Sequence, residues 1–75
     1  MAHTILAELV GNVLSVAVTE GTPVVAGDII VILESMKMEI PVLTEYDGVV
    51  RDLTVREGDV VQEGDVLAVV DPVMA

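Results

Sequence analysis

The chain repeats itself at a spacing of 37 residues. When residues 11–34 are set against residues 48–71 without a gap, eight of the 24 positions are identical. All six glycines take part, as the pairs Gly11 and Gly48, Gly21 and Gly58, and Gly27 and Gly64. Glycine recurring in register marks backbone that needs positive φ or close approach, so the same turns are expected twice. Neither copy can bury a face alone, and we expect the two copies to pack against each other.

The composition predicts that both copies are built from β-strands. The chain has 17 Val and 5 Ile, one aromatic residue (Tyr46) and no cysteine. β-Branched residues favour strands, and a chain of 75 residues forms one domain, here 1–75. Strands are expected at residues 3–10, 13–18, 24–25, 29–33, 40–43, 49–55, 60–61 and 66–70. The predicted fold is all-β, with eight strands in two four-stranded antiparallel sheets packed face to face.

A tight hairpin is expected between the strands at 29–33 and 40–43, with Met36 and Lys37 near its tip. Two-residue hairpin turns need positive φ at the centre, which is why Asn-Gly and Asp-Gly dominate them. Met and Lys adopt such dihedrals at a cost of about 1–3 kcal/mol each. Lys37 is also the only lysine of the chain. A broken local rule of this kind usually marks a functional site.

The segment Glu34-Ser35-Met36-Lys37-Met38 resembles the attachment motif of biotinyl carrier domains, usually Glu-Ala-Met-Lys-Met, with Ser35 in place of the usual Ala. The resemblance extends over roughly residues 4–71. It implies a flattened barrel-sandwich with quasi-two-fold symmetry, in which the lysine hairpin lies at one end and the termini at the other. Some biotinyl carriers insert a protruding thumb in the first half. Here 18–24 is as long as 55–61, so we expect no thumb.

The resemblance also implies a function. Lys37 would receive biotin from biotin protein ligase, and the biotinyl arm would shuttle carboxylate from a biotin carboxylase to a carboxyltransferase, which is expected to be that of an acyl-CoA carboxylase. Glu34, Met36 and Met38 would be recognised by the ligase or by partner enzymes. The domain would be a carrier, not an enzyme, and a monomer when isolated. His3, Ser15, Ser35 and the acidic residues form no nucleophile–base or metal-ligand pattern in the sequence.

Three functions stay open at this point. A biotin carrier is favoured by Met36 and Met38, whereas related lipoyl domains carry Asp-Lys-Ala around their lysine. An attachment protein that accepts either group lies between these two. A barrel-sandwich module without a carrier role is the third alternative, but it would give no reason for a single exposed lysine. Larger carriers have an Ala/Pro-rich linker before the domain. This chain begins at its first strand, and both a free-standing carrier and a domain of a longer polypeptide remain possible.

The charge of the chain excludes other classes of partner. The formal net charge is −10, whereas a nucleic-acid binder needs a basic surface to displace counterions. The same charge opposes an anionic membrane surface and would steer the domain toward basic clefts on enzymes. The first ten residues lack the basic region of a signal peptide, and the longest aliphatic run, residues 29–33, is too short to span a bilayer. A cytoplasmic location is therefore expected.

Overall fold

The computed structural model describes residues 2–72, which form eight strands and no helix. The strands are β1 (His3–Leu6), β2 (Gly11–Val16), β3 (Pro23–Val24), β4 (Ile29–Ser35), β5 (Met38–Leu43), β6 (Gly48–Leu53), β7 (Val60–Val61) and β8 (Val66–Pro72). They make two four-stranded antiparallel sheets, in the orders β1-β8-β6-β3 and β5-β4-β2-β7. The predicted fold class, strand number and division into sheets are confirmed. In the described part of the chain, no helix could cross a membrane.

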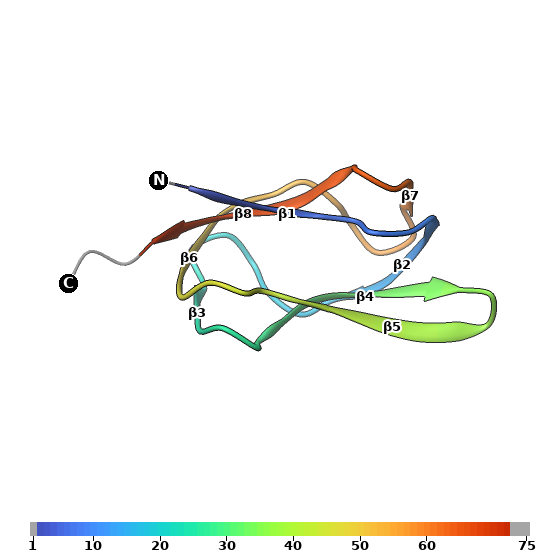
Figure 1. Cartoon of the computed structure of the whole chain (residues 1–75), viewed down its shortest axis with the longest axis horizontal. Coiled ribbons are helices and arrows are strands. Elements are labelled where there is room, and N and C mark those ends of the chain that lie inside the picture. The colour runs from blue at the N-terminus through green and yellow to red at the C-terminus, as the bar shows by residue number, and fades with distance from the viewer. Residues whose placement is uncertain (1, 73–75) are drawn as a thin grey trace.

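The molecule is elongated, 41 × 18 × 17 Å, and its two ends differ (Figure 1). The start of β1 lies beside the end of β8, since His3 pairs with Val70. The β4–β5 hairpin projects at the opposite end of the molecule (Figure 1). The chain between β2 and β3 is as short as the chain between β6 and β7, so the described structure has no thumb.

The structure extends the internal repeat beyond the part that the sequence revealed. A shift of 37 residues superposes β1 (3–6) on residues 40–43 of β5. The pairing of β1 with β8 contains a bulge, and the pairing of β5 with β4 contains a bulge at the equivalent position. Backbone hydrogen bonds follow the same shift. The Ala7 amide donates to the Asp65 carbonyl over 2.8 Å, and the Thr44 amide donates to the Asp28 carbonyl over 2.9 Å. The repeat therefore covers almost the whole described chain, as residues 3–34 and 40–71.

The predicted first strand, 3–10, was too long. β1 ends at Leu6, directly after a register shift between Ile5 and Leu6. Beyond this bulge the backbone bonds to a different partner. Ala7 accepts from Gly64 and donates to Asp65 in the turn before β8. The strand ends because the backbone stops pairing with β8 and bonds to the turn before it, although Ala7 continues the aliphatic pattern.

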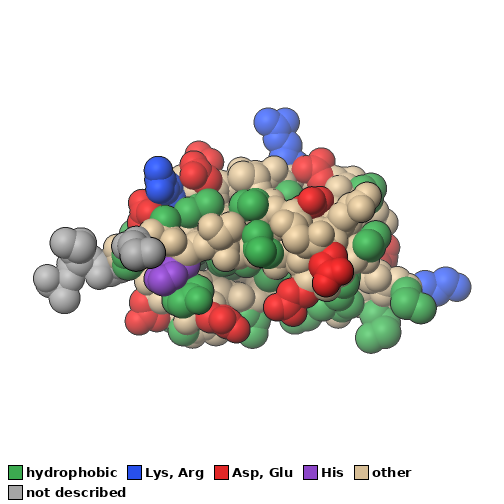
Figure 2. Space-filling view, turned by 45° about the horizontal axis from the view of Figure 1, so that its top comes forward, with side chains coloured by type: hydrophobic (Ala, Val, Ile, Leu, Met, Phe, Trp, Pro, Cys, Tyr) green, Lys and Arg blue, Asp and Glu red, His purple; other side chains and the backbone are tan. Residues whose placement is uncertain are grey.

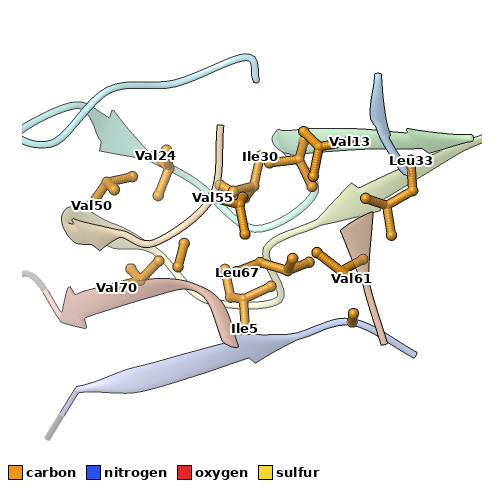
Figure 3. Close-up of a cluster of buried hydrophobic side chains, with 13 residues drawn as sticks. Ile5, Val13, Val24, Ile30, Leu33, Val50, Val55, Val61, Leu67 and Val70 are labelled. Carbon is orange, nitrogen blue, oxygen red and sulfur yellow. The ribbon is translucent and has the colours of Figure 1, made fainter. Parts of the chain in front are cut away.

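The core lies between the two sheets and consists of small aliphatic side chains (Figure 3). Val13 and Leu33 come from one sheet, and Val50 and Val70 come from the other, each at most 2% exposed. Full burial of such a side chain contributes about 1.5–3 kcal/mol. Because successive residues of a strand face opposite sides, this core fixes which residues of β4 and β5 face outward at the hairpin.

Candidate functional site

The hairpin closes in two residues. Ser35 and Met38 form the last pair of β4 and β5, and Met36 and Lys37 lie between them. Met36 has φ 52° and Lys37 has φ 66°, and they are the only non-glycine residues with positive φ among residues 2–72. Positive φ at both central positions is the geometry that two-residue hairpins require. Every other positive φ in the described chain is at a glycine. Backbone strain from positive φ is therefore confined to this turn in the described chain.

The side chains of the turn are open to solvent. Met36 is 91% exposed and Met38 is 62% exposed, and Lys37 is exposed as well. Both ion pairs within residues 2–72 involve Arg51, so the Lys37 ammonium has no carboxylate within 4 Å. The hairpin end thus presents a cation beside large apolar side chains (Figure 2). An amine held in this way is accessible to another protein from several sides.

Two carboxylates stand behind the turn. Glu34 and Glu39 are directly opposite each other in the β4–β5 pairing, and both side chains are exposed. Like charges in such a pair destabilise a sheet. The next residues inward along the pair, Leu33 and Ile40, turn toward the core side. The acidic pair is therefore displayed on the outer face, a few residues from Lys37.

Glu34 also has a structural role, which lies in its backbone. The Glu34 carbonyl packs so closely on Gly11 that a Cβ atom there would approach it to 2.7 Å. The carbonyl of Asp71, the counterpart of Glu34 in the repeat, packs on Gly48 in the same way. These contacts require no carboxylate. The side chain of Glu34 is exposed.

The predicted site residues Glu34, Met36, Lys37 and Met38 lie together on the end of β4, the turn and the start of β5. Glu39 was not among them, although it belongs to the same surface. Counting back from a two-residue turn pairs position 34 with position 39, so the register would have identified it. Within residues 2–72 no group of three or more His, Cys, Asp or Glu side chains could hold a metal ion. The site consists of an exposed amine beside two exposed methionines and two exposed carboxylates.

Comparisons with known proteins agree on one type of domain. Residues 3–70 match the family model described as "Biotin-requiring enzyme". A biotinylated protein TB7.3 homolog of Mycobacterium leprae is 54% identical over 50 residues, which cover 67% of this chain and 70% of that protein.

Solved structures give the same result for the fold. A single-chain, multi-domain long-chain acyl-CoA carboxylase superposes with a TM-score of 0.89 and 32% identity, over 99% of this chain and 7% of that one. The lipoyl domain of the 2-oxoglutarate dehydrogenase complex from Azotobacter vinelandii superposes with a TM-score of 0.73 and 27% identity, over 91% of this chain and 98% of that domain.

Proposed function

Because the chain belongs to the family of biotin-requiring attachment domains, we propose that it carries biotin covalently on Lys37 and serves as the biotin carboxyl carrier of an acyl-CoA carboxylase. The family is one of carrier domains, and the chain is accordingly a carrier and not an enzyme. The observation that supports the attachment residue is the turn itself. The single lysine of the sequence stands at one of two non-glycine positions with positive φ, exposed and without an ion pair among the described residues.

The residues present fit a biotinyl group joined through an amide bond. Lys37 Nζ would attack the carboxyl carbon of an activated biotin, the activating group would leave, and the amine would lose a proton. Amide formation needs an activated acyl group and an acceptor for the proton, and no described residue is hydrogen-bonded or ion-paired to the Lys37 amine. A separate enzyme, biotin protein ligase, must therefore supply the activated acyl group and accept the proton. The amide is neutral, so modification removes the positive charge from the tip.

The surface around Lys37 is proposed to be what the ligase recognises. Met36 and Met38 flank the amine with exposed, flexible apolar side chains, a property that suits contact with more than one partner. Glu34 adds a carboxylate to this surface, and Glu39, opposite it in the pairing, adds a second one. A ligase surface with an apolar groove and a basic group would complement this end of the domain.

The role in carboxyl transfer is supported by the similarity to a multi-domain acyl-CoA carboxylase. In such a system the domain must reach two partners, a biotin carboxylase and a carboxyltransferase. A narrow body with its modified tip at one end and both described ends of the chain at the other suits this task. The arm projects from one end while the opposite end leaves room for connections to other proteins.

A lipoyl group on the same lysine is the second candidate. The superposition on a lipoyl domain at 27% identity supports it, because the two chains share one scaffold. The residues beside Lys37 oppose it, since Met36 and Met38 replace the Asp and Ala that lipoyl domains carry. Biotin is therefore the first choice.

Intact-mass spectrometry after co-expression with a biotin protein ligase tests the proposal. We expect one biotinyl group on the wild-type chain and none on Lys37→Arg, with the circular dichroism spectrum unchanged. A matched control moves the lysine, as Lys37→Arg combined with Arg56→Lys, which creates an exposed lysine in a different turn. This variant should stay unmodified. Biotinylation of Lys37→Arg, or addition of a lipoyl group alone to the wild type, would refute the proposal.

A further inference from the structure

A groove runs along the seam where the edges of the two sheets meet. β1 is an edge strand of one sheet and β5 is an edge strand of the other. Residues from both strands and from the segments that follow them line a groove of about 1050 Å³. A smaller hollow of about 340 Å³ lies elsewhere, around β7. The seam is thus the larger of these two concave surfaces on the described part of the molecule.

The two leucines at the centre of the seam are equivalent in the internal repeat. Leu6 of β1 is 44% exposed, and Leu43 of β5, 37 positions later, is 46% exposed. Both line the groove. Each is a large apolar side chain left half uncovered, although the core lies next to it. Together they give the seam an apolar centre that nothing in the described chain covers.

Acidic residues surround this apolar centre. Glu8, Glu45 and Glu63 line the groove, and no lysine or arginine does. In Figure 2 the visible face carries acidic and hydrophobic side chains, while the basic groups project from its upper edge and from the hairpin end. A partner that fills the seam must therefore bring positive charge together with apolar side chains. A second copy of a chain with net charge −10 does not meet this requirement.

The edge strands β1 and β5 differ in how well their residues prevent pairing with a further strand. β5 carries Glu39 and Pro41, and charges and proline are the usual protection of an edge strand. The equivalent positions of the other edge are Ala2 and Thr4, and β1 itself contains neither proline nor a charged Asp, Glu, Lys or Arg. β1 thus offers its unpaired backbone groups along an apolar groove. This is the arrangement in which an extended peptide adds to a sheet.

The ends of the seam also differ. His3 stacks on Tyr46, with ring centroids 3.6 Å apart and planes at 5°, and this pair joins the two edges at the end near the chain termini. The equivalent positions at the hairpin end are Ile40 and Leu9. Ile40 is three residues from Lys37, or about 10 Å along an extended strand. A segment lying in the seam would extend toward the hairpin.

From these features we infer that the seam is a docking site for a basic, extended segment of another protein. The segment adds to β1 as a strand, buries apolar side chains on Leu6 and Leu43, and places lysine or arginine beside the three glutamates. Binding at the seam needs no modification of Lys37, so this inference and the proposed function can fail separately.

The test uses the unmodified 75-residue chain, labelled with ¹⁵N, and an acetylated, amidated hexapeptide of alternating lysine and valine. We expect saturable amide shifts centred on His3–Leu6 and Ile40–Leu43, and weaker binding as salt is added. The same peptide with N-methyl groups along one edge should lose the effect, because it cannot pair with β1. Shifts scattered over the acidic surface, no saturable shift at millimolar peptide, or equal binding of the N-methylated peptide would overturn the inference.

Matched variants separate the seam from general attraction. The double variant Leu6→Ser with Leu43→Ser should bind roughly tenfold more weakly. Leu14→Ser replaces a leucine of β2 that is 39% exposed, and this variant should bind as the wild type does. Glu45→Gln should weaken binding more than Glu57→Gln, which removes the same charge away from the seam. Equal effects within either pair, or a dimer of the free chain in analytical ultracentrifugation, would contradict the docking of a basic partner.

Discussion

Met36 and Lys37 hold backbone conformations that the rest of the described chain reserves for glycine. Two residues behind them, Glu34 opposes Glu39. Both features oppose folding, and they occur within six consecutive residues. Strain concentrated in this way persists only where the surrounding structure enforces it, and it is typical of functional sites. Here the β4–β5 pairing on one side and the two-residue closure on the other leave the turn no alternative.

The strain at Met36 can be tested without touching the lysine. Met36→Asn should stabilise the domain by about 0.5–1 kcal/mol, because asparagine tolerates positive φ and is preferred in such turns. The melting temperature should rise by about 2–8 °C for a domain of this size. Met38→Asn is the control, since Met38 lies in β5 with ordinary strand geometry and asparagine disfavours strands. Equal changes in calorimetry for both variants would mean that the turn stores no strain.

The repulsion between Glu34 and Glu39 can also be tested. Glu39→Arg should raise the free energy of unfolding by about 0.2–1 kcal/mol, because it replaces two opposed carboxylates by an opposite-charge pair without adding an amine. The gain should shrink in high salt. Glu57→Arg changes the net charge equally and serves as the control. Urea unfolding of the two variants measures the difference, and an equal gain would show that only the net charge matters.

At the scale of elements, each connection of the first half has a counterpart in the second. The turn before β4 and the turn before β8 both place a glycine at positive φ, Gly27 at 97° and Gly64 at 91°. Each glycine amide donates over 2.8 Å to the segment after an edge strand, to Thr44 and Ala7 respectively. One turn joins the end of β5 to the start of β4, and the other joins the end of β1 to the start of β8. The two turns therefore help to hold the β4–β5 pair and the β1–β8 pair in register.

Substitution of these glycines tests the symmetric turns. Gly27→Val and Gly64→Val should each destabilise by about 1–3 kcal/mol, because a β-branched residue is strained at positive φ although no atom would clash with its Cβ. The melting temperature should fall by roughly 4–24 °C. Ala26→Val, one residue earlier and exposed, should have little effect. Stability equal to that of the wild type in both glycine variants would refute the argument from the turns.

The sequence predicted the elements with local signals and missed those that depend on how the sheets close. Glycines in register and a lysine between two aliphatic runs were enough for the eight strands and for the hairpin. The equivalence of β1 and β5 was not apparent, since residues 3–10 and 40–47 share only two identical residues, Leu6 with Leu43 and Glu8 with Glu45. The pairing of Glu39 with Glu34 and the seam follow from register and from contacts between edges, which no single stretch of the sequence determines.

For the molecule as a whole, the duplicated scaffold makes the two sheets interchangeable in the core but not in function. Val13 of β2 and Val50 of β6 are equivalent, 2% and 1% exposed, and lie in different sheets. Only the sheet that contains β2, β4 and β5 leads to the lysine turn. A molecule built in this way should lose stability equally at both positions, since both valines contact the one shared core.

Val13→Ala and Val50→Ala should therefore each cost about 2–3 kcal/mol, from lost burial and from the cavity that remains. The urea m-value should stay at the wild-type value, because one cooperative unit unfolds in both cases. A cost confined to one variant, or a lower m-value, would mean that the halves unfold separately. Biotinylation of either variant below its melting temperature should proceed as in the wild type, since neither substitution reaches the hairpin. If Val13→Ala alone slowed modification, the turn geometry would depend on packing in its own sheet, and the two-residue closure could not by itself account for the presentation of Lys37.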